Sequence, residues 1–325
     1  MEKNQKFKAG RPCPACASES SVVDDSLGIW GWEDWRAGYR QCSQCGTSFA
    51  DSIFSPEQIG AWYSRQFSYP QYESPLKQLD ARTRVSFIRE KNWLPKPNES
   101  VIDVGCAAGL FLTSLKQAAP NSRYTGAELL PQVAAEYSGK RGISIVTLKE
   151  IEDHSVDMAF MWHVLEHGPE PQELLSQVLR VCRPGARLLI AVPNRHARGF
   201  DERGSQWVWC QAPWVHCVHF TSAGLSAILS RNSITNGAFH YRETVDSFHL
   251  AFLNMPDWIP TREGLLRFSE LRSEGGEKDL GSFLHSWKLW GNADYLRRAR
   301  LGRWLSELIT SDRQRSELLC MTRLP

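Results

Sequence analysis

The sequence predicts an α/β protein in which a doubly wound, mostly parallel sheet follows a small cysteine-rich module. Short apolar runs alternate with amphipathic helical patterns from residue 100 to about residue 240, which is typical of a parallel sheet covered by helices on both faces. Two CxxC pairs lie ahead of that region. The first apolar run, residues 101–104, leads through a glycine-bearing loop into a helical pattern, and such a turn offers backbone N–H groups to a ligand.

Length and composition are those of a globular protein. The chain has 325 residues, of which 42% are hydrophobic and 23% charged, and its formal net charge is +2. This charge does not indicate a dedicated nucleic-acid binder. No apolar run approaches the roughly 20 residues of a membrane span, and the first residues lack the apolar core of a signal peptide. We therefore expect a cytoplasmic protein that does not contact a membrane.

The N-terminal module, residues 1–54, is predicted to be a zinc ribbon. Its ligands are Cys13, Cys16, Cys42 and Cys45, which form two CxxC pairs separated by 25 residues. Short strands are expected at 39–42 and 46–50. Four thiolates fill a tetrahedral site, so the zinc is expected to be structural and not catalytic. A redox role for the CxxC pairs is the competing interpretation.

Residues 55–97 are predicted to form a helical linker or lid. Ser55, Pro56 and Gln58 supply an N-cap, a proline at the first helical position and a capping-box partner, so one helix is expected to reach about residue 67. A second helix is predicted over 75–94. Pro95 and Pro97 then break the pattern before the first strand of the sheet.

The loop after residues 101–104 is the best candidate for a ligand site. Asp103 closes the strand, Gly105 and Gly109 permit close backbone approach, and Glu128 closes the next predicted strand. Two carboxylates around one loop suggest a nucleoside cofactor. A dinucleotide fingerprint is incomplete, because Ala107 replaces its middle glycine and no further glycine follows at the required spacing. A phosphate-binding P-loop is excluded because no Gly-Lys-Ser/Thr follows.

Four motifs in order resemble those of the class I S-adenosylmethionine (SAM) methyltransferases. Residues 103–109 resemble motif I, usually DxGxGxG, with Ala107 as the departure. Residues 126–128 resemble the second motif, whose acidic side chain accepts hydrogen bonds from the ribose hydroxyls. Residues 155–167 resemble the fourth strand and its loop, and the Pro193-Asn194 pair after the fifth predicted strand also fits.

The resemblance implies a Rossmann-like, seven-stranded class I methyltransferase sheet. Its core would span residues 98–250, a helical cap insertion 251–310, and a final strand 311–325 inserted antiparallel beside the fifth. The resemblance also implies a SAM site. Its expected residues are Asp103, Gly105, Cys106, Ala107, Gly109, Glu128, Leu129, Trp162 and His163.

Methyl transfer to an alcohol or a carbon acid requires removal of a proton, for which histidine is well suited. His163 follows the fourth predicted strand. His216 and His219, three residues apart, would face the same way on one helical turn. Their segment resembles a Pro- and His-bearing stretch of sugar C-methyltransferases, in which a histidine is thought to act as base. His219 is the preferred candidate, ahead of His163 and His216, although each histidine would also suit a supporting role. A second metal site is not predicted, because the HxxH lacks a third ligand at readable spacing.

The leading functional hypothesis is SAM-dependent methylation of a small molecule at oxygen or carbon. A sugar, a nucleotide sugar or a natural-product intermediate would fit. Sugar C-methyltransferases share a cysteine-rich zinc module but usually carry a further C-terminal domain. One alternative is an RNA methyltransferase that grips RNA with the ribbon, although the ribbon has few basic residues for a phosphate-tracking surface. Another is a noncatalytic binding module that retains the SAM fold. The oligomeric state stays open.

Overall fold

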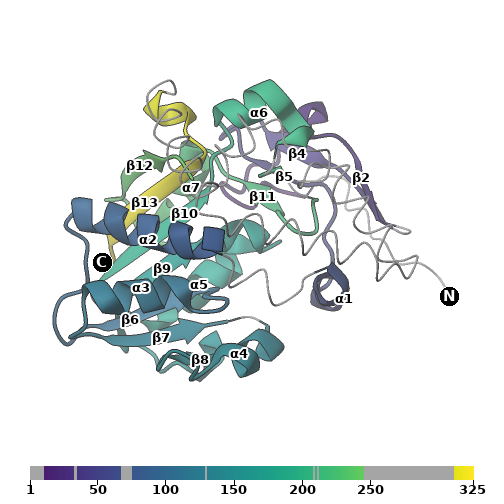
Figure 1. Ribbon diagram of the computed structural model, residues 1–325. Coiled ribbons are helices and arrows are strands. Elements are labelled where there is room, and N and C mark those ends of the chain that lie inside the picture. Colours follow the sequence, from purple (N-terminus) through teal and green to yellow (C-terminus); the bar gives the residue numbers. More distant parts are fainter. Residues whose placement is uncertain are drawn as a thin grey trace.

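A computed structural model of the protein describes residues 11–32, 35–66, 75–128, 130–207, 209–210, 212–244 and 311–325 (Figure 1). The predicted helical cap at 251–310 lies outside the described residues, and so does Leu129 among the expected cofactor contacts. The described part contains a seven-stranded sheet with helices on both faces, together with a small cysteine-bearing sheet.

The large sheet has the strand order β12-β13-β10-β9-β6-β7-β8. The strands from β8 to β10 pair in parallel, whereas β13 pairs antiparallel with both β10 and β12. This confirms the class I methyltransferase fold, including the final strand inserted beside the fifth. The strands are β6 (Ser100–Val104), β7 (Arg123–Ala127), β8 (Ser144–Val146), β9 (Val156–Trp162), β10 (Cys182–Pro193), β12 (Ala238–Arg242) and β13 (Glu317–Arg323).

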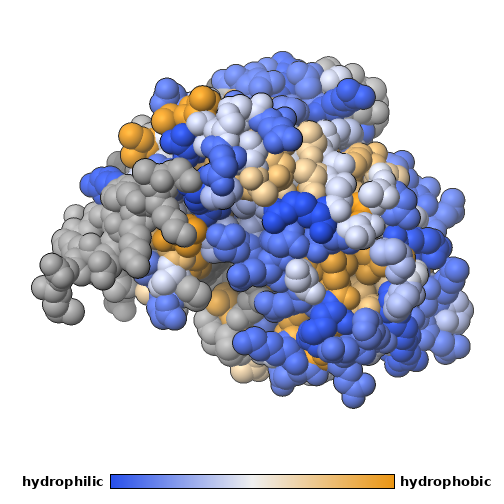
Figure 2. All heavy atoms as spheres, turned by 180° about the vertical axis from the view of Figure 1, so that it is seen from behind, coloured by the Kyte–Doolittle hydropathy of each residue, from blue (hydrophilic) through white to orange (hydrophobic). Residues whose placement is uncertain are grey.

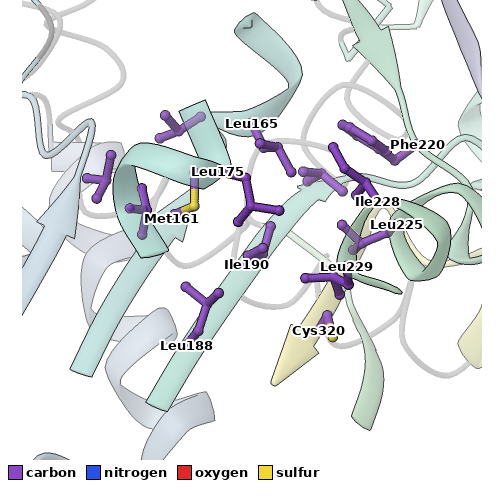
Figure 3. Close-up of a cluster of buried hydrophobic side chains, with 14 of the residues drawn as sticks. Met161, Leu165, Leu175, Leu188, Ile190, Phe220, Leu225, Ile228, Leu229 and Cys320 are labelled. Carbon is purple, nitrogen blue, oxygen red and sulfur yellow. The ribbon is translucent and has the colours of Figure 1, made fainter. Parts of the chain in front are cut away.

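Alternation along the buried strands creates two apolar faces. On one face, Phe160 of β9 packs with side chains of α2 and α3. On the other, Met161 packs with side chains of α5 and α7, and Figure 3 shows this second cluster. Because successive strand residues point to opposite faces, parallel strands buried on both sides are apolar throughout. The helices are α1 (Pro56–Gln66), α2 (Pro75–Glu90), α3 (Leu110–Ala118), α4 (Pro131–Tyr137), α5 (Pro171–Val181), α6 (Arg198–Arg203) and α7 (Ser222–Ser230).

Local hydrogen bonds explain where the first linker helix begins and where the second one ends. At α1, Ser55 N–H donates to Gln58 Oε1 at 2.8 Å and Gln58 N–H donates to Ser55 Oγ at 3.2 Å, so the predicted capping box is confirmed. The prediction for the second helix was four residues too long. Asn92 takes a left-handed conformation (φ 56°), and the Trp93 N–H returns to Ile88 O at 2.8 Å. These features close α2 after Glu90.

The cysteine-bearing module forms a four-stranded sheet in the order β1-β4-β5-β11. Its strands are β1 (Ser21–Val23), β4 (Tyr39–Cys42), β5 (Ser48–Ala50) and β11 (Val218–His219). Between β1 and β4 along the chain, β2 (Trp30–Trp32) pairs antiparallel with β3 (Trp35–Ala37). Because β11 comes from the segment after the core sheet's fifth strand, the module and the core share backbone hydrogen bonds. The expectation that His216 and His219 share one helical turn is therefore wrong, since His219 lies in a strand paired with Ser48.

Short 3-10 helices complete the described structure: η1 (Asp25–Leu27), η3 (Leu148–Glu150), η4 (Leu165–His167), η5 (Gly204–Gln206) and η6 (Asp312–Gln314). Hydrophilic residues dominate the face seen in Figure 2. Within the described ranges, no helix combines the length and the apolar character needed to cross a membrane.

Candidate active site and metal centre

The loop between β6 and α3, residues 105–109, is called the cofactor loop below. Gly105, Ala107 and Gly109 all take left-handed backbone conformations, with φ of 69°, 46° and 69°. A Cβ on Gly105 would lie 2.5 Å from Val164 Cγ2, so only glycine fits there. Ala107 occupies the position at which motif I usually has glycine, and this conformation costs an alanine roughly 1 kcal/mol relative to glycine.

Glu128, at the carboxyl end of β7, fastens the cofactor loop. Its side chain is buried, Oε2 accepts a hydrogen bond from Ala107 N–H at 2.9 Å, and Oε1 accepts one from Leu130 N–H at 3.1 Å. Hydrogen bonds to a charged acceptor are the stronger kind. The acidic residue of the second motif therefore holds the same loop that the first motif forms.

Asp103 lies beside this pair and is only 4% exposed. Burial raises the pKa of its carboxyl group to about 8; the charge of Glu128 adds to the rise and Arg84 opposes it. The carboxylate form therefore lacks sufficient positive charge around it. A cationic ligand placed here would supply that charge. SAM, which carries a sulfonium and an ammonium group, fits this requirement, so Asp103, Glu128 and the cofactor loop match what a SAM site needs.

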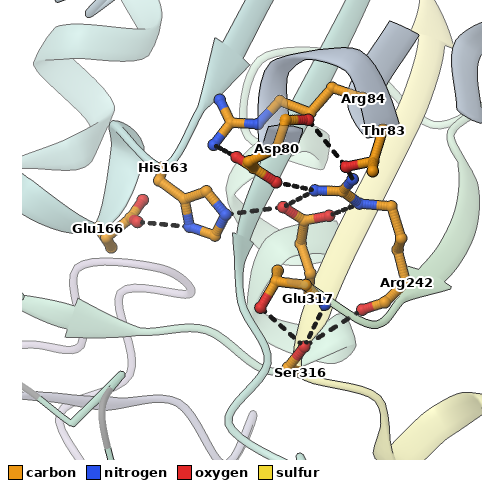
Figure 4. Close-up of polar contacts among 9 residues, drawn as sticks. Asp80, Thr83, Arg84, His163, Glu166, Arg242, Ser316 and Glu317 are labelled. Carbon is orange, nitrogen blue, oxygen red and sulfur yellow. Dashed lines mark hydrogen bonds and ion pairs between the residues drawn. The ribbon is translucent and has the colours of Figure 1, made fainter. Parts of the chain in front are cut away.

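His163 follows β9 at the same edge of the sheet and has a left-handed backbone (φ 55°). Its Nε2 lies 2.7 Å from Glu317 Oε1, and its Nδ1 lies 3.3 Å from Glu166 Oε1 (Figure 4). The ring stacks on Trp209, with centroids 4.7 Å apart and planes at 8°. Burial opposes the charged form, but the two carboxylates outweigh it, so the pKa of His163 is raised above 6.5.

A buried ion-pair network is connected to His163 through Glu317. Arg242 Nε contacts Glu317 Oε2 at 2.5 Å and Arg242 Nη2 lies 3.4 Å from Asp80 Oδ1, while Asp80 also pairs with Arg84 at 2.6 Å (Figure 4). The guanidinium groups of both arginines lie over the ring of Trp162, at 5.1 Å for Arg84 and 5.3 Å for Arg242. Trp162, a predicted cofactor contact, is thus only 4% exposed and held in this network.

Sequence reasoning missed Asp80, Arg84, Arg242 and Glu317. They come from α2, β12 and β13, which are far apart along the chain, and no local spacing connects them. The only available signal was that charged residues interrupt otherwise apolar strands. A buried charge requires a partner, and Arg242 and Glu317 on the paired strands β12 and β13 are such a pair.

His216 and His219 lie in the interior, where the cysteine module meets the core. His216 is 1% exposed, its Nδ1 lies 2.9 Å from Trp209 O, and burial lowers its pKa well below 6.5. His219 is fully buried, and its ring lies against Tyr39 and Phe200, both with centroids at 5.0 Å. Burial lowers the pKa of His219 to about 3, and the charge of Arg195 acts in the same direction.

The four cysteines of the two CxxC pairs converge as predicted. Cys13 Sγ lies 3.7 Å from Cys45 Sγ, Cys16 Sγ lies 3.5 Å from Cys42 Sγ, and all four sulfur atoms lie within 4.8 Å of one another. Tetrahedral zinc with Zn–S bonds of about 2.3 Å separates its sulfur ligands by about 3.8 Å. The four thiols therefore fit a zinc ion, and they form no disulfide.

The module is anchored to the core through side chains as well as through β11. Arg195, which follows β10, donates to Asp24 at 3.1 Å and to Ser48 at 2.9 Å. Tyr39 O–H donates to His216 O at 2.7 Å. Cys13, Cys42 and Cys45 belong to the same apolar cluster as core residues of β6, β9 and β10. The cysteine-bearing module thus packs directly against the segment that contains His216 and His219.

Comparison with known proteins agrees with this geometry. Residues 77–233 match the family described as "Methyltransferase domain". The match covers just under half of the chain. The matched stretch includes β6, the cofactor loop, Glu128, β9 and the histidine segment, so the domain assignment and the strand order support each other.

Individual relatives are similar to parts of the chain. An uncharacterized 37.1 kDa protein in transposon Tn4556 of Streptomyces fradiae is 31% identical over 108 residues, covering 30% of this chain and 31% of that protein. A ubiquinone biosynthesis O-methyltransferase of Klebsiella pneumoniae is 29% identical over 135 residues, covering 39% of this chain and 54% of the enzyme. The chain thus spans about a third of the first relative and about half of the second.

Among solved structures, a SAM-dependent methyltransferase from Archaeoglobus fulgidus superimposes with a TM-score of 0.45 at 15% identity. The superposition covers 75% of this chain and 94% of that structure.

Proposed function

We propose that the protein is a SAM-dependent methyltransferase that acts on a small molecule at oxygen or carbon. The observation that carries the proposal is the cofactor loop clasped by Glu128 at the edge of a class I sheet. Bound SAM supplies an electrophilic methyl group on a sulfonium sulfur. The protein's own part is to hold the nucleoside with Glu128, to present Asp103 to the cationic portion, and to align the acceptor.

The reaction is written here for an alcohol acceptor. The acceptor O–H bond releases its proton, the oxygen forms a bond to the methyl carbon, and the carbon–sulfur bond breaks with its electron pair staying on sulfur. The products are the methyl ether, S-adenosylhomocysteine and one proton. Positioning and proton removal are therefore the two tasks that the acceptor side must perform.

His163 is the histidine that we propose to contact the acceptor. It follows β9, which pairs with β6, the strand that carries Asp103, and its side chain retains 10% exposure. Both of its ring nitrogens already face carboxylates, Nε2 that of Glu317 and Nδ1 that of Glu166, so we propose that His163 positions the acceptor and takes up a proton only after the acceptor displaces one of these carboxylates. His219 is fully buried among aromatic rings, and His216 is tied to Trp209 O. The preference for His219 and the role of His216 remain predictions, and the described contacts favour His163 over both.

We also propose a structural zinc ion in the four-cysteine site. Cys13, Cys16, Cys42 and Cys45 would complete a tetrahedral shell, which leaves no position for a catalytic water. Metal binding would contribute to folding of the module, and the module in turn carries Tyr39 and Ser48, which contact the histidine segment and Arg195.

The RNA-methyltransferase alternative receives little support from the ribbon. Residues 1–54 contain six Lys and Arg but seven Asp and Glu, so the ribbon is slightly acidic. Within the described part of this module, the large exposed apolar side chains are Val22, Val23 and Ile29, which do not suit phosphate contacts. The noncatalytic module and the cytoplasmic location stay predictions. The small-molecule class fits the O-methyltransferase relative, without specifying the acceptor.

The test is a methyl-transfer screen with labelled SAM and a cell extract, run with wild type and Glu128→Ala. We expect label to enter a low-molecular-weight product with wild type only. Equal labelling with both proteins, or labelling confined to RNA, would contradict the proposal. Glu136→Ala, which changes an exposed glutamate of α4 paired with Lys140, is the matched control and should label like wild type.

A further inference from the structure

A second group of metal-ligating side chains lies apart from the cofactor loop and the cysteine site. Glu166 and His167 of η4 come together with His216, and one ligand atom from each lies within 4.8 Å of those of the other two. The rings of His167 and His216 have centroids 4.8 Å apart at 72°. These three residues are called the Glu–His–His group below.

Glu166 requires a partner that the described residues do not supply. Its side chain is fully buried, and among the described residues Oε2 has neither a hydrogen-bond nor an ion-pair partner. Burial of a carboxylate without hydrogen bonds is among the most costly arrangements in a protein. His163 Nδ1, 3.3 Å from Oε1, addresses one oxygen only. A cation beside the other oxygen would satisfy the group.

Both histidines are oriented as metal-binding histidines are. His167 Nδ1 lies 2.8 Å from Val215 O, and His216 Nδ1 lies 2.9 Å from Trp209 O. A carbonyl oxygen can only accept, so Nδ1 carries the proton and donates in each case. In the neutral rings the lone pair is then on Nε2. A backbone carbonyl that fixes Nδ1–H in this way is the usual support of a histidine that ligates metal through Nε2.

We propose that Glu166, His167 and His216 bind one zinc ion, separate from the ion of the cysteine site. Two imidazoles and one carboxylate suit zinc, and three protein ligands leave a fourth position for water or for an oxygen of the acceptor. Zinc–ligand bonds of about 2.1 Å separate the ligand atoms by about 3.4 Å, so binding would draw the three side chains together.

Spacing along the chain did not predict this group. The HxxH pairs His216 with His219, but His219 is not part of the group. The other two members, Glu166 and His167, come from the loop after β9. The group also connects the two parts of the acceptor side. Glu166 contacts His163, and His216 O accepts the hydrogen bond from Tyr39 of the ribbon. An ion here would therefore sit between the proposed acceptor contact and the ribbon.

Metal analysis of the full-length protein, purified without chelators, tests the proposal. We expect two zinc ions per chain in wild type and one in Glu166→Gln, which keeps the side-chain shape but weakens the ligand. His167→Gln, at a partly exposed position, should also retain one. His154→Gln is the matched control, because the exposed His154 lies outside the group, and it should retain two. Two ions in Glu166→Gln and in His167→Gln would overturn the assignment.

A cobalt titration of zinc-containing wild type, compared with Glu166→Gln, covers the case in which purification removes the second ion. We expect d–d absorption without a thiolate-to-cobalt charge-transfer band, and an affinity at least about 100-fold higher than that of Glu166→Gln. Absence of any such absorption from a wild type that contains one zinc ion would show that the group binds no metal and that Glu166 serves only His163.

This proposal deepens the proposed function but is measured separately from it. Affinity for S-adenosylhomocysteine should change by less than about threefold in Glu166→Gln, because Glu128 and the cofactor loop are untouched. Loss of the second ion with cofactor affinity retained supports the metal site alone. Failure of wild type to bind S-adenosylhomocysteine would count against the methyltransferase activity and would leave the metal result intact.

Discussion

The cofactor loop and the Glu–His–His group differ in how the chain builds them. The loop and its clasp come from one short stretch, in which backbone conformation and a single carboxylate, Glu128, do most of the work. The Glu–His–His group combines η4, the segment before β11 and the ribbon that supports it. The difference teaches that the proposed cofactor half of the site is a local feature, whereas the proposed acceptor half depends on contacts between distant segments.

The largest expected effect comes from a substitution that disrupts the proposed acceptor side of the site and leaves the proposed cofactor side intact. Cys42→Ser removes a ligand of the four-cysteine site, and a small metal-dependent module loses much of its folding free energy without its ion. We expect loss of the ribbon's zinc, a lowered melting temperature and loss of methyl transfer, with S-adenosylhomocysteine affinity within about threefold of wild type. Calorimetry and metal analysis measure these. Cys320→Ala, at a buried cysteine of β13 outside the site, should keep the zinc; unchanged zinc content in Cys42→Ser would refute the account.

A second prediction separates binding from turnover. His163→Gln should lower kcat by about 100-fold or more, the size expected for loss of a positioned proton-transfer group, while S-adenosylhomocysteine affinity stays close to that of wild type. Single-turnover kinetics with an acceptor found in the labelling screen provides the measurement. His240→Gln, on β12 at the far end of the sheet order from β8, is the control and should leave kcat unchanged. A normal kcat in His163→Gln would return the role to His219.

The buried aspartates should respond oppositely to the same substitution. Asp103 has its pKa raised by burial from 3.8 to about 8, so the folded state binds the extra proton and stability falls as pH rises through that interval. Asp103→Asn should therefore stabilise the cofactor-free protein at pH 8 by about 1 kcal/mol or more, and weaken SAM binding.

Asp80 is the matched comparison. Burial alone would raise its pKa, but Arg84 and Arg242 outweigh burial and lower it below 3.8, so its stabilising contribution is present at neutral pH and is lost as pH falls. Asp80→Asn should destabilise by about 3 kcal/mol or more at pH 7. Urea unfolding at pH 6 and pH 8 measures both variants. The same sign of change for the two aspartates at pH 8 would contradict this interpretation.

The smallest effect concerns the departure from motif I. Ala107→Gly relieves the left-handed strain at φ 46° but gives the unfolded chain more freedom, so the net change in unfolding free energy should stay within about 1 kcal/mol. Cofactor affinity should stay within about threefold of wild type. Gly105→Ala is the contrast, because its Cβ would meet Val164 Cγ2 at 2.5 Å. Equal tolerance of both substitutions would mean that the loop is not shaped as described.

Sequence reasoning predicted the parallel sheet, the cysteine site and the glycine-bearing loop from local signals: strand and helix periodicity, CxxC spacing, and glycines at a strand-to-helix turn. The final strand inserted beside the fifth came from the family resemblance alone. Sequence reasoning did not predict that Val218 and His219 would pair with Phe49 and Ser48. Two-residue strands carry almost no periodicity, so partner choice there depends on tertiary packing.

The same dependence on tertiary packing explains why the sequence did not predict the surroundings of His163, His216 and His219. Three-residue spacing suggested that His216 and His219 face one way, but the intervening chain changes from a turn to a strand. The partners that give His163 its setting, Glu317 and Trp209, are distant in sequence. Long-range side-chain pairing leaves no signature in one sequence, whereas the backbone-built cofactor loop does.

Calorimetric titration with S-adenosylhomocysteine tests the central claim most directly. The account predicts one saturable site per chain in wild type and an affinity about 100-fold lower or worse in Glu128→Ala, since two charge-assisted hydrogen bonds of the clasp are lost. Glu136→Ala should bind like wild type. No binding by wild type, or equal binding by Glu128→Ala, would contradict the assignment of this loop as the cofactor site.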